Sequence, residues 1–424
     1  MRITILAVGS RGDVQPYIAL GLGLQAAGYD VRIAAASNFE SFIREYGLGY
    51  GRLDADFREL MQNDRAQDAM ASRNPLRRQR ELMGLVHQTL ERFATDTWEV
   101  CQDADAVIYS SIAVTGYSVA EKLEIPSCWA PLAPMSRTRA FPSVLAPISD
   151  RNKQLNWLTH LIEEQIAWQP ARGFINHWRR EMLGLKPFPF MGPYGRLERE
   201  RFSVLYGFSP SVIPKPSDWG DSIHVTGYWF LDQSSHWQPP AALVDFIESG
   251  TPPVYIGFGS MINRDAEALT RLILQAVVRS KQRAVLATGW DSLGNVDELP
   301  DTIFQIESIP HEWLFPRMAA VVHHGGAGTT AAGLRAGIPS VIVPFGADQP
   351  FWGQRVYELG IGPKPISRQN LSGESLAEAI THAVCDKEMR RRAVAIGEQI
   401  RAEDGVKRAV HVFQRQVLSR FSLS

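Results

Sequence analysis

The chain has 424 residues, of which 45% are hydrophobic and 21% are charged, with 34 glycines and 26 prolines. These values are ordinary for a folded globular protein, so they exclude disordered and fibrous classes. The 44 Lys and Arg against 45 Asp and Glu leave a net charge of −1, which gives no electrostatic reason to expect nucleic acid as the main partner. At about 150 residues per domain, the length predicts two or three domains.

The apolar start Ile3–Val8 runs directly into polar residues, which indicates a first strand rather than a signal peptide. No later run approaches the roughly 18 apolar residues of a membrane span. The cysteines Cys101, Cys128 and Cys385 are widely spaced and contain no CxxC pair, which argues against a disulfide framework and a zinc site. We therefore expect a soluble, cytoplasmic protein of several domains.

Short apolar runs alternate with segments of helical periodicity, such as Asp265–Ser280, along most of the chain. This alternation indicates parallel sheets covered on both faces. The pattern restarts after about residue 220, so we expect two doubly wound domains. The predicted strands are Arg2–Val8, Asp30–Ala36, Ala106–Ser110, Ser127–Ala130, Phe202–Tyr206, Val254–Phe258, Arg283–Ala287, Ile303–Ile306, Ala320–His323 and Ser340–Val343.

A proline-rich stretch, Ser209–Pro216, predicts a linker between the two halves. We place an N-terminal domain at 1–208, the linker at 209–222 and a C-terminal domain at 223–403. Residues 57–101 and 150–185 interrupt the strand pattern with helix-like sequence. They either shape a pocket on the first domain or only cover its sheet, and the sequence leaves both interpretations open.

The strongest local motif is the run from His323 to Thr330, HHGGAGTT, between a predicted strand and a helix. Its glycines let backbone N–H groups approach a ligand, and the helix start adds unpaired donors and a positive dipole end. Hydroxyls of Thr329 and Thr330 could add donors to phosphate oxygens. No Lys follows the glycines and the register is not GxGxxG, so the run predicts a diphosphate site that is neither a P-loop nor a dinucleotide fingerprint.

The adjacent histidines of this run point to opposite faces of a strand, so they cannot both bind one metal ion. His323 could be an ordinary core residue. His324, at the strand end, is the better candidate to donate to a phosphate.

Two other glycine-rich turns follow predicted strands. For Gly257–Ser260 we favour a plain loop, because nothing else in the sequence supports a ligand site there. Gly9–Asp13 precedes a helix with Pro16 in its expected first turn, and Asp13 would commonly serve there as the N-cap, with catalysis as the alternative.

Two adjacent hydrogen-bonding side chains, Asp348 and Gln349, follow another strand and suit a polyhydroxylated ligand, with helix capping as the alternative. The triplets Asp54–Asp56 and Asp103–Asp105 could suggest a metal-bound diphosphate. Their contexts favour surface turns.

Five segments of the chain form a distinctive set: GSRGDVQP at 9–16, VTGYWF at 225–230, IPHEWLFP at 309–316, HHGGAGTT at 323–330 and DQPFWG at 348–353. Together they resemble the family 1 UDP-glycosyltransferases of the sterol glucosyltransferase type. The resemblance covers essentially the whole chain and is most specific from 308 to 353. It is weakest at 57–101 and 135–200, where an acceptor pocket would be built.

The resemblance implies a GT-B fold: two Rossmann-like domains with a cleft between them and a C-terminal helix, about 404–424, that crosses back to the first domain. By motif, Asp13 would be the general base, and His324 would stabilise the leaving diphosphate. The residues implied in donor binding are Ser10, Arg11 and Gly12 beside the base, Ile309 and His311 at the nucleotide base, Ser260, His324, Ala327, Gly328 and Thr329 at the diphosphate, and Asp348 and Gln349 at the glucose hydroxyls. Ala332 stands where plant relatives have a Glu for the ribose, so ribose recognition is unassigned.

The activity implied by the resemblance is inverting transfer of glucose from UDP-glucose to a hydroxyl of a hydrophobic acceptor, a sterol or similar lipid or aglycone, with no metal and no other cofactor. A polyketide, flavonoid or macrolide acceptor is the first alternative, and a non-catalytic sugar-nucleotide-binding protein is the second. A nicotinamide-dependent oxidoreductase would need a GxGxxG after the first strand, which Gly9–Gly12 does not supply. A separate hypothesis is peripheral membrane contact through the basic cluster of Arg73, Arg77, Arg78 and Arg80, although such charge runs are more often solvated faces.

Overall fold

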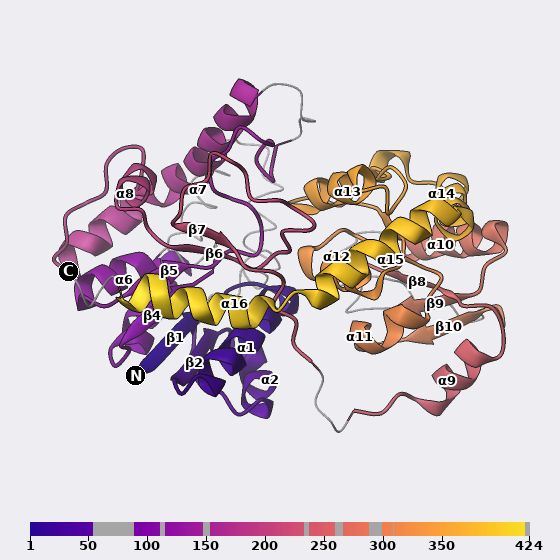
Figure 1. Cartoon of the computed structure of the whole chain (residues 1–424), viewed down its shortest axis with the longest axis horizontal. Coiled ribbons are helices and arrows are strands. Elements are labelled where there is room, and N and C mark those ends of the chain that lie inside the picture. Colours follow the sequence, from indigo (N-terminus) through magenta and orange to yellow (C-terminus); the bar gives the residue numbers. More distant parts are fainter. Residues whose placement is uncertain are drawn as a thin grey trace. The chain divides into compact units, whose positions relative to one another are not determined.

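A computed structural model shows two compact α/β units (Figure 1). The first unit comprises Met1–Pro210, Pro214–Leu231 and Asp404–Ser424, and the second comprises Ser211–Ile213 and Asp232–Glu403. The residues that the structure describes are 1–53, 89–110, 115–146, 153–232, 237–258, 266–287, 299–307 and 309–419.

The first unit is built on a seven-stranded parallel sheet in the order β3-β2-β1-β4-β5-β6-β7. Its central strands are continuous apolar runs, because both faces of the sheet are buried. The strand order reverses between β1 and β4, so the carboxyl ends of these two strands form the switch point of the sheet. The strands are β1 (Arg2–Leu6), β2 (Asp30–Ala35), β3 (Gly49–Arg52), β4 (Ala106–Tyr109), β5 (Ser127–Trp129), β6 (Val204–Tyr206) and β7 (Ile223–Val225).

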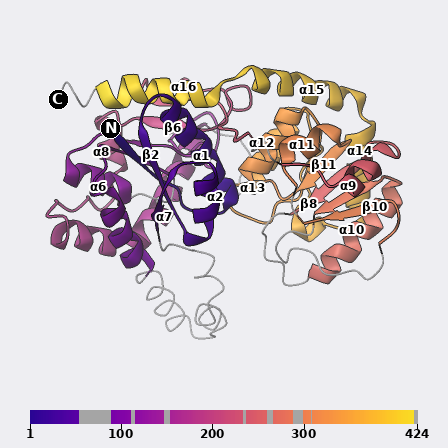
Figure 2. The same cartoon turned by 90° about the horizontal axis from the view of Figure 1, so that it is seen from below.

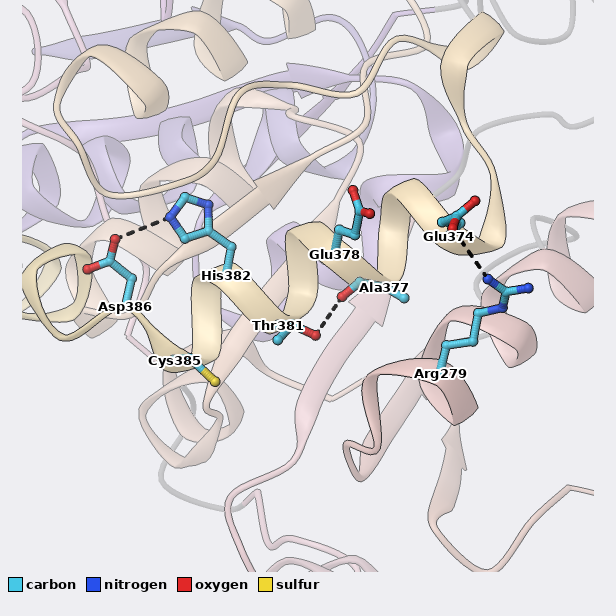
Figure 3. Close-up of a pocket in the computed structure, with 8 residues that line it drawn as sticks. All are labelled: Arg279, Glu374, Ala377, Glu378, Thr381, His382, Cys385 and Asp386. Atoms are coloured by element: carbon cyan, nitrogen blue, oxygen red, sulfur yellow. Dashed lines mark hydrogen bonds and ion pairs between the residues drawn. The ribbon is translucent and has the colours of Figure 1, made fainter.

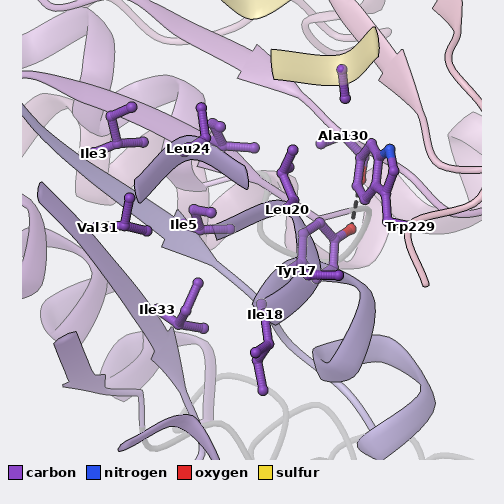
Figure 4. Close-up of a cluster of buried hydrophobic side chains, with 14 of the residues drawn as sticks. Ile3, Ile5, Tyr17, Ile18, Leu20, Leu24, Val31, Ile33, Ala130 and Trp229 are labelled. Carbon is purple, nitrogen blue, oxygen red and sulfur yellow. Dashed lines mark hydrogen bonds between the residues drawn. The ribbon is translucent and has the colours of Figure 1, made fainter. Parts of the chain in front are cut away.

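Helices cover both faces of this sheet. On one face, α1 and α16 lie side by side over a core that includes Ile3, Ile5 and Leu20 (Figures 1, 2 and 4). On the other face, residues 89–101, α6 and α7 pack against strand residues such as Leu6 and Val107. The helices are α1 (Arg11–Ala26), α2 (Glu40–Glu45), α6 (Thr115–Leu123), α7 (Lys153–Glu181), α8 (Tyr194–Arg199) and α16 (Gly405–Val412), which continues as a π-helical segment at Phe413–Leu418.

The second unit has a five-stranded parallel sheet in the order β10-β9-β8-β11-β12, with its switch point between β8 and β11. Helices α10 and α14 cover one face, and α9, α11 and part of α12 cover the other. The strands are β8 (Val254–Gly257), β9 (Ala284–Ala287), β10 (Ile303–Ile306), β11 (Ala320–His323) and β12 (Ser340–Ile342). The helices are α9 (Ala241–Glu248), α10 (Ala266–Ser280), α11 (His311–Leu314), α12 (Ala327–Ala336), α13 (Gln349–Glu358), α14 (Gly373–Cys385) and α15 (Lys387–Ala402).

The predicted fold class is confirmed: each predicted strand is present, and both sheets are parallel. Two strands, β3 and β7, were not predicted. Strand β7 pairs with β6 in the first sheet, so residues 223–225 lie in the first unit rather than in the second domain expected from 223 onward. The C-terminal segment from Asp404 also lies in the first unit.

The described parts of the two insertions cover the sheet. Phe93 from the first insertion, and Trp168 and Trp178 from α7, are buried in the same cluster as Leu6 and Val107. Of the two interpretations of the insertions, these residues therefore fit the one in which the insertions cover the sheet.

None of the helices in the described ranges is long and apolar enough to span a membrane. The three cysteines are free thiols, with Cys101 and Cys128 buried and Cys385 exposed.

Candidate active site

Two of the three predicted glycine-rich turns lie, within the described residues, at the switch point of their own sheet. The Gly9–Asp13 turn connects β1 to α1, and the His323–Thr330 run connects β11 to α12. Doubly wound sheets bind ligands at this point, because the loops diverge there and helix N-termini point toward the opening. Position alone therefore marks these two turns as candidate binding elements.

The Gly9–Asp13 turn holds a carboxylate in a fixed orientation. Ser10 is the N-cap of α1, and Asp13 is the third helical residue. One carboxylate oxygen of Asp13, Oδ2, accepts hydrogen bonds from the Ser10 backbone N–H at 2.7 Å and from the Ser10 hydroxyl at 2.8 Å. The prediction that Asp13 is the N-cap is wrong, because its side chain reaches back to the cap from within the first turn. Pro16 is likewise the sixth helical residue and not part of the first turn.

Gly9 makes room for this carboxylate. Its φ is +133°, which L side chains rarely adopt, and a Cβ at this position would lie 2.5 Å from Asp13 Oδ2. Only glycine therefore fits the turn without displacing Asp13. The neighbours Arg11 and Gly12 are exposed, and the Arg11 guanidinium lies 4.6 Å from the centre of the Phe42 ring.

A buried network supports α1 one turn after Asp13. The Tyr17 hydroxyl donates to the carbonyl of Ala130 at 2.5 Å, and its ring meets the edge of Trp229 at 5.8 Å (Figure 4). Trp229 Nε1 in turn donates to the hydroxyl of Thr226 at 3.0 Å. Burial raises the pKa of Tyr17 well above its usual value, and the Asp13 charge raises it further. The VTGYWF segment thus packs against Tyr17, one helical turn after Asp13. The sequence did not indicate this supporting role for Tyr17.

In the second unit, the two adjacent histidines have different environments. His323 is fully buried on β11, and its Nδ1 accepts the Gly325 backbone N–H at 3.1 Å. His324 follows the strand, and a Cβ on Gly326 would lie 2.5 Å from its Nε2. Glycine at 326 therefore leaves room for the His324 ring. The two histidines lie as expected, with His323 in the core and His324 at the end of the strand.

His324 is an uncharged imidazole at neutral pH. Burial lowers its pKa to about 4. Its Nδ1 is enclosed and has no hydrogen-bond partner among the described residues. A neutral imidazole carries one N–H, so His324 can donate one hydrogen bond to a phosphate oxygen without a charge of its own.

Helix α12 begins at Ala327 with Gly326 as the N-cap, so the N–H groups of Ala327, Gly328 and Thr329 lie in the first turn, where helices leave donors unpaired. Thr330 differs from the prediction. Its N–H and its hydroxyl both lie 2.9 Å from the Gly326 carbonyl oxygen, and its side chain is buried. The Thr330 hydroxyl therefore serves the helix rather than a phosphate.

Asp348 and Gln349 both have local structural roles. Asp348 is the N-cap residue of α13, and its Oδ2 accepts the indole N–H of Trp352 at 2.8 Å. Gln349 is buried, and its Oε1 accepts the backbone N–H groups of Phe345 at 2.7 Å and Gly346 at 3.2 Å. These contacts shape the loop after β12 and orient the two side chains at the carboxyl edge of the sheet.

Ile309 and His311 follow β10 at the same edge. The His311 ring stacks on Phe315, with ring centres 4.2 Å apart, and meets the edge of Tyr255 at 5.7 Å. Ile309 is half-buried against the same cluster. The result is a rigid apolar and aromatic surface beside the sheet.

Several predicted residues lie outside the described residues: Ser260, the Asp54–Asp56 triplet and the basic cluster of Arg73, Arg77, Arg78 and Arg80. The other triplet is a surface turn, as predicted. Hydrogen bonds from Arg32 lower the pKa of Asp103 to about 2, and Arg2 forms a second ion pair with it. Within the described ranges, no group of three or more His, Cys, Asp or Glu could hold a metal ion.

A separate hollow of about 700 Å³ lies on the second unit (Figure 3). It lies along α10 and α14, where His382 pairs with Asp386 at 3.2 Å and Arg279 with Glu374 at 3.9 Å. Arg279 is in the last turn of α10, which runs from the carboxyl end of β8 back to the amino end of β9. The Arg279 end of this hollow therefore lies toward the amino ends of the strands, away from the switch point.

The chain has the fold of solved GT-B glycosyltransferases. Residues 3–142 match the glycosyltransferase family 28 N-terminal domain, and residues 271–410 match the erythromycin biosynthesis protein CIII-like C-terminal domain. The solved glycosyltransferase of kitacinnamycin is similar with a TM-score of 0.73 at 19% identity, covering 98% of this chain and 99% of that one. The spinosyn forosaminyltransferase SpnP gives 0.71 at 16% identity, covering 99% of both chains.

Within this class, the chain is similar over nearly its whole length to sterol 3-beta-glucosyltransferases. That of Cryptococcus neoformans var. neoformans is 40% identical over 98% of this chain and 27% of the relative. That of Emericella nidulans is 40% identical over 98% of this chain and 30% of the relative. The chain thus spans less than a third of the length of these relatives. It has the GT-B fold and two glycosyltransferase domain matches, and nearly its whole length is similar to a region of the sterol 3-beta-glucosyltransferases.

Proposed function

We propose that the chain is an inverting glucosyltransferase that transfers glucose from UDP-glucose to a hydroxyl of a sterol or similar hydrophobic acceptor without a metal ion. The observation that carries the proposal is the carboxylate of Asp13, fixed by Ser10 at the switch point of the first sheet and accommodated only because residue 9 is glycine. The sterol acceptor is supported by the relatives at 39–40% identity.

Asp13 is the general base of the proposed reaction. The acceptor oxygen attacks C1 of glucose from the face opposite the diphosphate, and its proton passes to Asp13 as the new C1–O bond forms. A carboxylate is too weak a base to remove an alcohol proton beforehand, but the oxygen becomes acidic as it bonds to C1. Ser10 holds the carboxylate ready for this step.

UDP leaves with the electron pair of the broken C1–O bond. His324 and the N–H groups of Ala327, Gly328 and Thr329 face the charge that develops on the diphosphate. Their dipoles are fixed before the reaction, so they substitute for a metal ion in stabilising it. Asp348 and Gln349 bind the glucose hydroxyls, and Ile309 and His311 lie against the nucleotide base.

The first test is product analysis by mass spectrometry with purified protein, UDP-glucose and EDTA. The acceptor panel combines sterols with polyketide, flavonoid and macrolide aglycones, because the structural neighbours include transferases of natural products. We expect a hexose on a sterol, with β linkage by NMR, and none with Asp13→Asn that still binds UDP-glucose. Transfer only to polyketide, flavonoid or macrolide aglycones would show that the acceptor is of that class and not a sterol. Equal activity of Asp13→Asn would remove Asp13 from the mechanism.

A further inference from the structure

The first half of α7 has an apolar surface that no described residue of the unit covers. Leu155, Leu158, Ile162 and Ile166 recur every three or four residues and therefore share one face of the helix. Their exposed fractions are 40%, 44%, 51% and 65%. We refer to these four residues as the α7 stripe.

The neighbouring face of the same helical turns is buried and polar. Asn156, Thr159, His160 and Glu163 are 3%, 7%, 1% and 8% exposed. A helix on the surface of a globular protein normally turns its apolar face inward, so the polarity of this segment is inverted. The inversion puts the apolar side chains in contact with whatever surrounds the unit.

Hydrogen bonds to a neighbouring loop fix this orientation. Asn156 Nδ2 donates to the carbonyl of Arg139 at 3.2 Å, and the Thr159 hydroxyl accepts the Ser143 backbone N–H at 2.8 Å. His160 Nε2 lies 3.2 Å from the carbonyl oxygen of Phe141. Rolling the helix to bury the stripe would break these bonds and leave buried polar groups unpaired, so the exposure of the stripe is built into the fold.

None of the exposed residues of this segment is charged, and Arg172, near its end, is half-buried. From 154 to 173, the exposed residues are Gln154, Leu155, Trp157, Leu158, Ile162, Ile166, Ala167, Pro170 and Gly173. Glu163 is buried, and Glu164 is paired with Arg137 at 2.6 Å. Helix α15, by contrast, exposes Glu388, Arg391 and Arg392 to water. Contiguous uncharged apolar surface of this kind marks an interaction site.

The margins of the stripe supply aromatic and basic side chains. Phe190 and Met191 are 64% and 51% exposed, and the carbonyl of Met191 accepts the Gln165 side-chain N–H at 3.2 Å, beside Ile166. The Arg172 guanidinium lies 4.4 Å from the centre of the Phe190 ring. Arg139, at the other end, is exposed. An apolar face with aromatic and cationic margins is complementary to an anionic lipid surface, whose acyl region takes the apolar side chains and whose headgroups take the arginines.

We propose that the α7 stripe docks on an anionic lipid surface, from which the chain takes its hydrophobic acceptor. The acceptor part rests on the proposed function, whereas docking requires neither donor nor transfer. The surface lies on a helix remote in sequence from the basic cluster at 73–80. Figure 1 shows α7 as a long helix at the margin of the first unit.

The test is flotation of the full chain, without UDP-glucose or acceptor, on vesicles of phosphatidylcholine with or without phosphatidylserine. We expect the wild type to float with the anionic vesicles at low salt and less with phosphatidylcholine alone. The double variant Ile162→Glu/Ile166→Glu should reduce the bound fraction at least about tenfold, because it places two charges on the docking face. Val278→Glu is the matched control, since Val278 is also exposed, at 62%, but lies on α10 of the second unit. Circular dichroism and thermal unfolding check that each variant is folded.

Two outcomes would overturn the inference: a wild-type chain that does not float at low salt, or a double variant that floats as well as Val278→Glu. If the wild type fails to float but forms a dimer that the double variant dissociates, the stripe is a contact between copies instead. Because the assay contains no donor, a failure of docking is separate from a failure of transfer. Transfer to a water-soluble aglycone by the double variant would then confirm an intact active site.

Discussion

Replacing Gly9 by alanine should abolish most of the transfer activity while leaving the fold intact. The new Cβ would lie 2.5 Å from Asp13 Oδ2 and 2.7 Å from its Cγ, at a φ of +133°. Both distances are too short for non-bonded atoms. The carboxylate must therefore leave its two hydrogen bonds with Ser10, or the turn must shift.

Two magnitudes follow from this geometry. A non-glycine residue in this region of φ costs about 1–3 kcal/mol of stability, which a protein of this size tolerates. A positioned general base contributes about 10²–10⁴-fold to rate, so a displaced Asp13 should lower kcat/KM by about 10²-fold or more. UDP-glucose affinity should change little if the second unit supplies most of the donor contacts.

Gly28→Ala is the matched control. Gly28 also has a positive φ, +91°, but a Cβ there meets nothing within 4 Å. It therefore introduces backbone strain without displacing a side chain. The measurements are kcat/KM on the sterol acceptor, denaturant unfolding and calorimetric binding of UDP-glucose for both variants. If Gly9→Ala keeps kcat/KM within about threefold of Gly28→Ala, the fixed orientation of Asp13 does not matter for the reaction.

The other predictions concern stability. The pKa of His324 is about 4 in the folded protein and 6.5 for an ordinary histidine, so as pH drops from about 6.5 to 4 the unfolded state takes up a proton first and the free energy of unfolding falls. His324→Gln should remove about 3 kcal/mol of this pH dependence, measured by urea unfolding at pH 6.5 and pH 4. Arg179 is 1% exposed and pairs with Glu121 at 2.7 Å, so Arg179→Met should lower the unfolding free energy by about 3 kcal/mol, and an unchanged denaturation midpoint would contradict this. Tyr17→Phe leaves the buried Ala130 carbonyl without its 2.5 Å donor and should cost about 1–3 kcal/mol in the same assay, with a smaller effect indicating that water replaces the hydroxyl.

The strands that the sequence predicted are rich in apolar residues, because burial on both faces leaves a clear signal. The two that it missed lack this signal. Strand β3 is GYGR, whose pairing with β2 depends on backbone contacts, and β7 is the three-residue segment IHV. Short or glycine-rich strands are specified by their neighbours in the sheet rather than by their own composition.

The positions of the candidate site residues could be predicted, but their hydrogen-bond partners could not. Asp, Ser, Thr and Gln cap helices, close loops and bind ligands with the same atoms, so their spacing leaves the role open. The structure gives the Thr330 hydroxyl to Gly326 and the Gln349 oxygen to the loop at 345–346. It also shows that Ser10, and not Asp13 as predicted, is the N-cap of α1.

The same geometry shows why helix capping and proton transfer are compatible at Asp13. The hydrogen bonds from Ser10 close the first turn of α1 and, at the same time, hold the carboxylate in one orientation. Tyr17 and Trp229 anchor the following turn in the buried core, so the turn has little freedom to move. Gly9 adds backbone freedom to the loop after β1, but any side chain there would displace the carboxylate. A local structural cost at Gly9 thus keeps the Asp13 carboxylate in the orientation that the proposed mechanism requires of its base.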